Sequence, residues 1–318
     1  MDKICVDCPR MCKVDREKEK GFCLAGNKIF VAKVIKNFMW EEPSLCFDKG
    51  VTAIFFSGCN LKCEFCQNEK ISRQMCGEEF SSETFANFLK QLDEEETDGF
   101  DFVSPTQFTS LILKSFDFYK PKHKIIWNSN GYERVENVEK LSTYVDVFLP
   151  DFKYCDNTLA LRLSKCPQYK ENAISSIRKM AEKKPNVFVG KEMTQGVIVR
   201  HLVLPGEVKN SIEVLNEIKN NFPDVFVSLM SQFTPNGKGE KTRGITPLEY
   251  KIVLSHFEKL GLENGYMQDF SSSSESFVPN FWNSFDKKKE MTYYYDKKNL
   301  CFETFGGLYG WKTKSYTA

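Results

Sequence analysis

Short apolar runs alternate with amphipathic stretches through the middle of the chain. Six runs have the length and composition of buried strands, at 51–56, 100–104, 124–127, 145–149, 197–204 and 224–230. Between the first two runs, Phe85, Phe88 and Leu92 recur at the spacing that places them on one face of a helix. The same spacing indicates helices around 174–181 and 212–218. This alternation predicts parallel strands joined by helical crossovers.

One further helix is marked at both ends by residues that start and stop helices. Thr246 is suited to the N-cap, Pro247 to the first helical position, and Glu249 completes a capping box with Thr246. Gly261 supplies the stop signal. We therefore expect a helix that begins at Pro247 and ends just before Gly261.

Six strand–helix units favour an α/β fold with a partial (β/α)6 barrel of the TIM type over a closed barrel of eight units. A doubly wound sheet is the alternative. We divide the chain into a cysteine-rich N-terminal extension and connector (1–50), the core barrel (51–270) and a C-terminal extension or tail (271–318). Within the first of these, a strand is expected at 29–35.

The composition is that of an ordinary globular protein, with 41% hydrophobic and 27% charged residues among 318. Lys and Arg number 44 against 43 Asp and Glu, and this balance argues against binding to nucleic acid through phosphate neutralisation. No apolar run approaches the roughly 18 residues of a membrane helix. The first residues lack the apolar segment of a signal peptide. We expect a cytoplasmic protein with no membrane association.

Cysteine is the informative residue type. Seven of the 12 cysteines lie in two tight groups within the first 66 residues. In a cytoplasmic chain thiols stay reduced, so clustered cysteines indicate metal ligands rather than disulfides. The other five lack metal-ligand spacing and are interpreted as small apolar residues: Cys46, Cys76, Cys155, Cys166 and Cys301.

The second group, Cys59-x3-Cys63-x2-Cys66, directly follows the apolar run at 51–56. Gly58 allows a sharp turn where that strand ends, and chemistry in barrels of parallel strands lies at this end of the strands. A cluster of four irons normally takes four cysteines, so three ligands leave one iron with an open position. The alternative is a structural zinc site with a distant fourth ligand, Cys76 or Cys46.

The first group offers four thiols within 19 residues, at Cys5, Cys8, Cys12 and Cys23. Four sulfurs suit either tetrahedral zinc or a second iron–sulfur cluster, and the sequence does not choose between them. Such a short, charged segment has too few apolar residues for a hydrophobic core of its own. We therefore expect a bound metal to stabilise its folded state. Free thiols are the remaining alternative.

Several further motifs accompany the cysteines in a characteristic order. They are Cys8-Pro9-Arg10-Met11-Cys12, Trp40-Glu41-Glu42-Pro43, Phe56-Ser57-Gly58-Cys59-Asn60, Cys66-Gln67-Asn68, Leu149-Pro150-Asp151-Phe152-Lys153-Tyr154, Arg200-His201-Leu202-Val203-Leu204-Pro205-Gly206 and Gly265-Tyr266-Met267-Gln268. With an aromatic residue before the last cysteine of the loop, the pattern resembles the radical S-adenosylmethionine (SAM) superfamily. The wider set resembles its pyruvate formate-lyase-activating-enzyme-like subgroup over about residues 5–280.

The resemblance implies a [4Fe–4S] cluster on the catalytic cysteines Cys59, Cys63 and Cys66, with SAM chelating the fourth iron. A one-electron donor such as flavodoxin or ferredoxin would reduce it. Reductive cleavage of SAM would then yield methionine and a 5′-deoxyadenosyl radical that abstracts hydrogen. The subgroup implies an oxidoreductase acting on a peptide or protein, with activation of a glycyl radical enzyme as one form. Radical SAM chemistry on a small molecule or RNA, and a non-catalytic metal-binding protein, are the alternatives.

The resemblance also suggests SAM contacts at the ends of the second and third strands. The superfamily often has Gly-Gly-Glu-Pro after the second strand, where this chain has Ser-Pro-Thr-Gln, so Thr106 is assigned to SAM on weaker grounds. Gln107 departs from the Pro-Thr-His of the subgroup. Thr106 as a helix cap is the alternative. Asn128 and Asn130 suit hydrogen bonds to the methionyl part or the ribose, or else form a simple turn.

Charged residues end the fourth and fifth strands. Asp151 and Lys153 point to the same side of a strand, and the resemblance places such a pair at SAM; a surface ion pair is the alternative. Alternation sends Arg200 and His201 to opposite faces. Arg200 matches an arginine that the family places near SAM, whereas His201 is expected to face the helices.

Overall fold

The structure is a computed structural model that describes residues 4–236, 239–262, 264–270 and 311–313. Its centre is a sheet with the strand order β11-β10-β9-β8-β6-β5-β4-β2-β1-β3. The parallel strands are β2 (Val51–Phe56), β4 (Phe100–Val103), β5 (Ile125–Ser129), β6 (Val147–Pro150), β8 (Glu192–Leu202), β9 (Phe226–Met230) and β10 (Gly265–Gln268). All six predicted strands form and are parallel; β10 was not predicted.

The order of the parallel strands follows the chain from β2 to β10 without reversal. A doubly wound sheet would reverse its order at a switch point, so the arrangement is that of an open barrel sheet. The prediction of an α/β fold with a mostly parallel sheet is confirmed.

Antiparallel strands extend this sheet. They are β1 (Ile29–Phe38) beside β2, β3 (Glu78–Phe80) beside β1, β7 (Val187–Val189) beside β8, and β11 (Trp311–Thr313) beside β10. The strand predicted at 29–35 is present and three residues longer; the other three were not predicted. Most of the C-terminal extension (271–318) lies outside the described residues, apart from β11.

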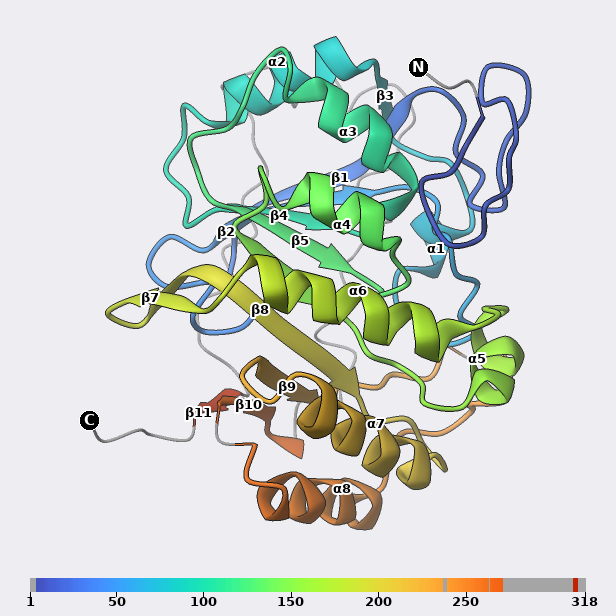
Figure 1. The fold of residues 1–318 in the computed structure, drawn as a ribbon, viewed down its shortest axis with the longest axis vertical. Helices are drawn as coiled ribbons and strands as arrows, with labels where there is room; N and C mark the ends of the chain where they lie inside the picture. Colours follow the sequence, from blue (N-terminus) through green and yellow to red (C-terminus); the bar gives the residue numbers. More distant parts are fainter. Residues whose placement is uncertain (1–3, 237–238, 263, 271–310, 314–318) are drawn as a thin grey trace.

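Helices pack along one face of the sheet (Figure 1). They are α2 (Ser82–Leu92), α3 (Thr109–Ser115), α4 (Val135–Leu141), α5 (Asn157–Ser164), α6 (Tyr169–Lys183), α7 (Val208–Asn221) and α8 (Pro247–Lys259), with the short α1 (Glu69–Ser72) and the 3-10 turn η1 (Thr106–Phe108). The predicted ends of α8 are present. The Thr246 side chain accepts from the Glu249 N–H at 3.2 Å, and Gly261 has a φ of +59°.

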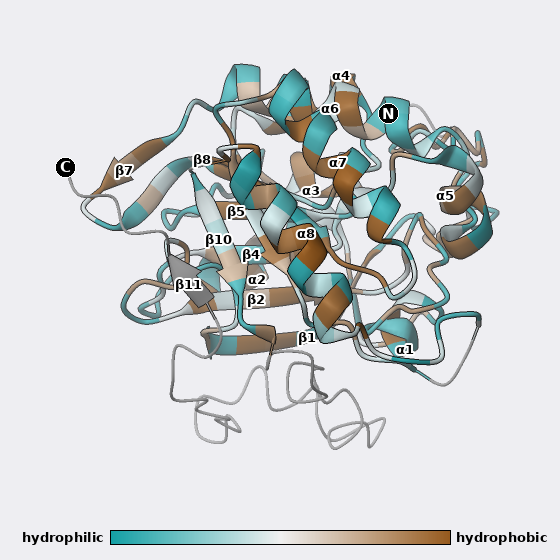
Figure 2. Ribbon diagram, turned by 90° about the horizontal axis from the view of Figure 1, so that it is seen from below, coloured by the Kyte–Doolittle hydropathy of each residue, from teal (hydrophilic) through white to brown (hydrophobic). Residues whose placement is uncertain are grey.

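The two faces of the sheet carry different cores. Helix residues and outward-facing strand residues such as Phe102, Trp127 and Phe148 form the larger cluster. Inward-facing residues, among them Ala53 and Ile126, pack against the segment that joins β1 to β2. In Figure 2, brown apolar segments run along the strands and along the helices that cover them. Residues 39–50, which join β1 to β2, therefore pack against the inner face of the sheet.

Residues 4–26, here called the N-terminal lobe, are seated against α3 and α4. The Asp7 carboxylate accepts from Ser110 and from Arg16, each at 3.0 Å, and its backbone carbonyl accepts from Asn137 at 2.7 Å. Arg134 donates to the carbonyl of Val6 at 2.9 Å. These contacts hold the first cysteine group against the barrel. Across the described part of the chain, no helix has the length and apolarity to cross a membrane.

Candidate functional site

Residues 57–68, here called the cluster loop, leave the carboxyl end of β2 and carry Cys59, Cys63 and Cys66. Gly58 starts the loop with a φ of +75°, and a Cβ there would collide with the carbonyl oxygen of Cys23. The loop therefore needs glycine for both its conformation and its contact with the N-terminal lobe. All three cysteines are half-buried.

Hydrogen-bond donors lie beside the sulfurs of Cys59 and Cys63. The Leu61 N–H lies 3.4 Å from Sγ of Cys59, and Nδ2 of Asn130 lies 3.5 Å from the same sulfur. The Ser164 hydroxyl donates to Sγ of Cys63 at 3.0 Å. Three thiols on one loop, with donors directed at two of the sulfurs, fit an iron–sulfur cluster, because such donors stabilise thiolates and tune a cluster.

Burial works against the charged form of these thiols. It raises the pKa of Cys59 to about 11 and that of Cys66 to about 12, with the Cys63 sulfur adding to both shifts. Thiolates at these positions therefore need a bound cation, which cluster irons would supply.

The sequence offered Cys46 and Cys76 as a distant fourth ligand of a zinc site. In the structure, the Cys46 thiol donates to the Phe38 carbonyl at 3.2 Å, and the Cys76 sulfur lies 3.6 Å from the Ser57 hydroxyl.

Asp151, Lys153 and Arg200 form one network at the ends of β6 and β8. Nζ of Lys153 lies 2.6 Å from Oδ2 of Asp151, and Nε of Arg200 lies 3.2 Å from its Oδ1. Burial raises and both cations lower the pKa of Asp151, and the net shift is downward. The pKa of Lys153 is raised by Asp151 and by the Cys63 sulfur, despite burial. Tyr154, the residue after Lys153, pairs with the Ser164 hydroxyl at 2.6 Å, and this hydroxyl donates to Cys63, so the charged pair is connected to the cluster loop.

The three other residues assigned to SAM differ in how they relate to this network. Asn128 joins it directly, because its Oδ1 accepts from Arg200. Asn130 contacts the cluster loop, as its Nδ2 donates to Oδ1 of Asn60 at 2.7 Å. Thr106 is not brought to the network. Its hydroxyl donates to Glu133 at 2.6 Å, and Glu133 also accepts from Trp127 on the helix side of the sheet.

Three carboxyl groups near Arg200 were given no role from the sequence, although Glu41 and Glu42 belong to one of the motifs. Oε2 of Glu41 lies 3.0 Å from the Arg200 guanidinium, and Oδ2 of Asp101 accepts from Asn128 at 3.2 Å. Glu42 is fully buried beside them and feels the charge of both Arg200 and Glu41. The available signal was acidic residues within otherwise apolar segments, Asp101 in a strand and the Glu pair before Pro43.

Gln107 was noted only as a departure from the family pattern. Its buried Nε2 donates to the carbonyls of Ser57 at 3.0 Å, Gly58 at 3.2 Å and Ser104 at 2.8 Å. Two of these carbonyls begin the cluster loop. Gln107 therefore ties the end of β4 to the backbone that presents the cysteines.

The four cysteines of the N-terminal lobe are neighbours. Sγ of Cys23 and Sγ of Cys12 lie 3.5 and 3.8 Å from the Cβ position of Gly21, and Cys5, Cys12 and Cys23 all act electrostatically on Cys8. Among the residues placed by the structure, no three His, Cys, Asp or Glu side chains stand in an arrangement that would hold a metal ion. The metal of this lobe stays a prediction.

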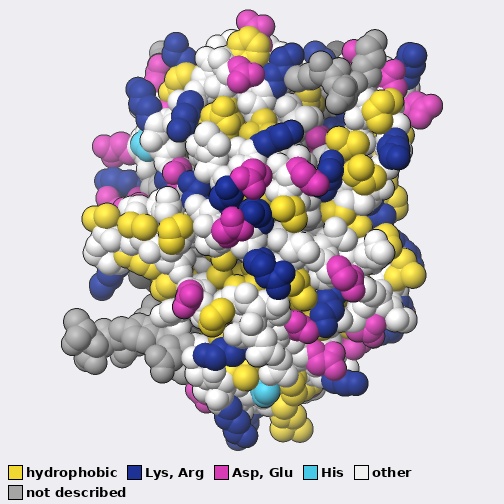
Figure 3. Space-filling view, viewed as in Figure 1, with side chains coloured by type: hydrophobic (Ala, Val, Ile, Leu, Met, Phe, Trp, Pro, Cys, Tyr) yellow, Lys and Arg dark blue, Asp and Glu magenta, His cyan; other side chains and the backbone are white. Residues whose placement is uncertain are grey.

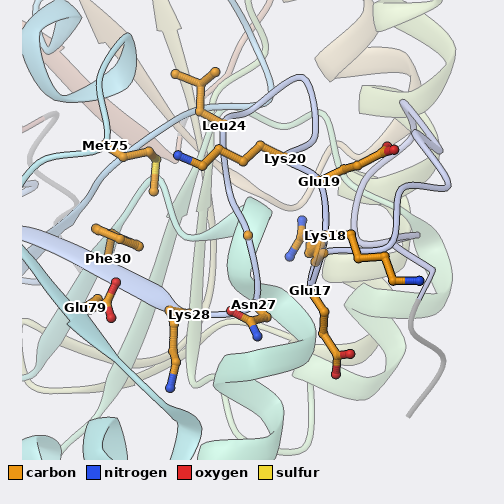
Figure 4. A pocket seen from close by; sticks show the side chains of 12 residues that line it. Glu17, Lys18, Glu19, Lys20, Leu24, Asn27, Lys28, Phe30, Met75 and Glu79 are labelled. Carbon is orange, nitrogen blue, oxygen red and sulfur yellow. The ribbon is translucent and has the colours of Figure 1, made fainter.

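A pocket of about 270 Å³ lies between the N-terminal lobe and β1 (Figure 4). Lys20, Phe30 and Met75 line it, together with acidic and basic side chains of the lobe. Met75 also lies near Gly58, so this pocket borders the cluster loop from outside the barrel.

The histidines lie apart from the cysteines. His201 is fully buried, and its ring nitrogens pair with the Phe152 carbonyl at 2.8 Å and the Ser211 hydroxyl at 2.9 Å. Ser211 belongs to α7, so His201 faces the helices as expected. His256 pairs with Asn216, and His123 lies 3.7 Å from Asp93.

Comparison with known proteins agrees with this site. Residues 49–168 match the family model of the 4Fe-4S single cluster domain, and this stretch contains the cluster loop and the strands from β2 to β6. The match places the three cysteines at the end of the first barrel strand within a domain that binds a single 4Fe-4S cluster. The chain is also 30% identical over 274 residues to the uncharacterized protein MJ0674 of Methanocaldococcus jannaschii, covering 82% of this chain and 76% of that protein. The chain belongs to the same family as this archaeal protein.

Solved structures are more distant. SuiB of Streptococcus suis is 14% identical with a TM-score of 0.48, over 69% of this chain and 50% of that chain. A radical SAM methyltransferase of Sphaerobacter thermophilus is 11% identical with a TM-score of 0.47, over 69% and 66%. The chain thus spans half the length of SuiB. Likeness at this level identifies no activity or substrate.

Proposed function

We propose that the protein is a radical SAM enzyme of the pyruvate formate-lyase-activating-enzyme-like subgroup, an oxidoreductase that abstracts hydrogen from a peptide or protein. The observation that carries this proposal is the buried Asp151–Lys153 pair at a strand end that Tyr154 and Ser164 connect by hydrogen bonds to the Cys63 sulfur. When bound, a reduced [4Fe–4S] cluster with SAM supplies reductive cleavage of SAM and a radical able to abstract hydrogen.

The residues of the chain hold and orient these groups. Cys59, Cys63 and Cys66 would hold the cluster and leave one iron without a protein ligand. Asp151 offers a carboxylate to an ammonium group, and Lys153 offers an ammonium to a carboxylate, which suits the zwitterionic end of SAM. Arg200 holds Asp151 in place from β8.

The substrate class and the electron donor are inferred from the sequence motifs. A peptide or protein target, glycyl radical enzyme activation in particular, is carried by the subgroup resemblance alone. Flavodoxin or ferredoxin is the expected donor class. On the face in Figure 3, basic and acidic side chains are interspersed rather than gathered into a basic surface, which favours a protein or small molecule over RNA.

The test is SAM cleavage by anaerobically reconstituted, reduced protein. We expect methionine and 5′-deoxyadenosine in equal amounts, and their loss when Cys59, Cys63 and Cys66 are replaced together by Ala. Cys155→Ala is the matched control, because this cysteine lies outside both groups and should leave the products unchanged. Absence of products from cluster-loaded wild-type protein with a competent reductant would favour a non-catalytic metal-binding protein instead.

A further inference from the structure

Near the network of Asp151, Lys153 and Arg200, the inner face of the barrel holds buried polar atoms without hydrogen-bond partners. Glu42, Asp101 and Ser228, here called the acidic floor, are each 0% exposed. Both carboxylate oxygens of Glu42, Oδ1 of Asp101 and the Ser228 hydroxyl make no hydrogen bond to any described residue. Ser228 is near enough to favour the ionised form of Glu42, yet no hydrogen bond of normal geometry joins them. Buried polar groups without hydrogen-bond partners cost free energy and are rare. A bound group that donates hydrogen bonds to these four oxygens would remove this cost.

The nearby donors are directed elsewhere. The Asn128 amide donates to Oδ2 of Asp101 at 3.2 Å and to Oε1 of Glu41 at 3.4 Å. The Arg200 guanidinium contacts Glu41 at 3.0 Å and Asp151 at 3.2 Å. Glu41 and Asp101 also contact each other through their carboxyl groups, and the oxygens that remain without a partner are those of Glu42, Oδ1 of Asp101 and the Ser228 hydroxyl.

The charge of the region points the same way. Glu41, Glu42, Asp101 and Asp151 outnumber the cations Arg200 and Lys153. Burial raises the pKa of Glu42 and of Asp101 to about 7 and that of Glu41 to about 8, with neighbouring carboxylates adding to each shift. A further cation would relieve this repulsion, and one that carries N–H donors would also satisfy the free oxygens.

Side-chain exposure shows from which side an occupant would arrive. The exposed fraction is 20% for Asp151, 12% for Arg200 and 11% for Glu41, and it falls to zero at Glu42. The polar side chains from Asp151 through Arg200 and Glu41 to the acidic floor therefore become progressively more buried. A substrate extending from the cluster loop into the barrel would bring its tip to the floor.

We infer that the acidic floor binds a primary ammonium or guanidinium group of the substrate. This inference rests on the proposed function, because it takes the barrel interior as the substrate site. An ammonium has three N–H donors for the four open oxygens. Mg²⁺ and Ca²⁺ need six to eight oxygen ligands, more than the floor presents, and Mg²⁺ usually keeps several of its waters. The floor thus distinguishes substrates with a cationic tip from neutral or acidic ones.

The experiment measures binding of small cations to anaerobically purified, cluster-loaded protein by calorimetry, without SAM or reductant. The probes are propylammonium and methylguanidinium, with tetramethylammonium as a control that has charge but no N–H, and with K⁺ and Mg²⁺, all at constant ionic strength. Glu42→Gln and Ser228→Ala test the floor. Glu133→Gln is the matched control, being another buried Glu, located on the helix side of the sheet.

Millimolar binding of propylammonium or methylguanidinium, weakened at least tenfold by Glu42→Gln and retained in Glu133→Gln, would support the inference. Equal binding of tetramethylammonium, stronger binding of a metal ion, or no binding at all would overturn it; in the last case ordered water fills the floor. Displacement of propylammonium by SAM would also overturn it, since the floor would then belong to the SAM site. None of these results depends on SAM cleavage, so failure here is separable from failure of the proposed function.

Discussion

Nδ2 of Asn130 lies 3.5 Å from Sγ of Cys59. The opposite side of the same amide accepts from the backbone N–H of Tyr132 at 3.0 Å, which keeps the nitrogen turned toward the sulfur. The end of β5 is thus connected to the cluster loop, which leaves β2. Asn130 was assigned to SAM from the sequence, and in the structure its direct contact is with a cysteine.

Asn130→Ala should lower the reduction potential of the cluster. Hydrogen bonds to cluster sulfurs stabilise the extra electron of the reduced state, so loss of one donor disfavours reduction. Iron content should fall far less than in a variant lacking a cysteine. A redox titration followed by electron paramagnetic resonance measures the midpoint. Asn172→Ala in α6 is the control, because the Asn172 amide donates to the Gln168 carbonyl, and equal potentials in the two variants would argue against the contact.

Lys153→Ala should weaken SAM binding at least tenfold, equivalent to about 1.4 kcal/mol. The ammonium lies 2.6 Å from Asp151, and its removal leaves Asp151 paired only with Arg200. Iron content should stay near the wild-type value. Equilibrium binding of SAM to cluster-loaded protein measures the change, with Lys170→Ala as the control, since Lys170 pairs with Glu217 outside the network. A loss of iron with unchanged SAM affinity would indicate a structural role.

Gly58→Ala should destabilise the protein much more than Gly261→Ala. Both glycines have positive φ, +75° and +59°, so alanine at either is disfavoured by about 1–2 kcal/mol. At Gly261 no atom lies within 4 Å of the new Cβ, whereas at Gly58 the Cys23 carbonyl must move. Denaturant unfolding and iron content measure the difference. Similar losses in both variants would show that the contact between the lobe and the loop contributes nothing.

The barrel strands were predictable because they are buried on both faces, which leaves continuous apolar runs in the sequence. The opposite orientations of Arg200 and His201 followed from strand alternation alone. β10 was missed because its burial alternates, so it leaves no continuous apolar run in the sequence. The capping residues of α8 act locally, so its two ends could be predicted well.

The acidic floor could not be predicted, because its members come from three distant segments. Glu42 lies in the connector after β1, Asp101 in β4 and Ser228 in β9, and only closure of the sheet brings them together. The direction of Thr106 likewise depends on Glu133, which lies in another loop. Sequence motifs indicate which strand ends carry chemistry, but they do not show which side chains share a cavity.

Glu42→Gln should stabilise the protein at high pH. The pKa of Glu42 is raised by burial to about 7, above the 4.5 of an ordinary glutamate, so the folded state holds this proton more tightly than the unfolded chain. Its contribution to stability is intact below about pH 4.5 and is lost as the pH rises through 7. The gain of the variant should therefore be larger at pH 8 than at pH 5, by up to about 1.4 kcal/mol for each unit of the pKa shift.

Thermal unfolding at these two values of pH measures the gain from Glu42→Gln. Glu182→Gln is the control, because its side chain is 58% exposed on α6. A gain independent of pH would mean that Glu42 does not titrate in this range. A pH-dependent gain that disappears when propylammonium is added would link the titration to the acidic floor.

Replacement of Cys5 and Cys8 together by Ala should remove the metal of the N-terminal lobe and leave the cluster loop able to bind iron. The lobe contacts the barrel through Asp7, whose carboxylate bonds Ser110 and Arg16, and these contacts do not use the cysteine sulfurs. Metal analysis should show loss of one zinc if the lobe holds zinc, or of about four irons if it holds a second cluster. The variant should unfold at a lower temperature, because a short lobe without its metal loses its main source of stability. Cys166→Ala, a buried cysteine outside both groups, should keep the full metal content. If the double variant kept all its zinc and iron, the lobe would be held by its contacts with α3 and α4 alone, and its four thiols would be free.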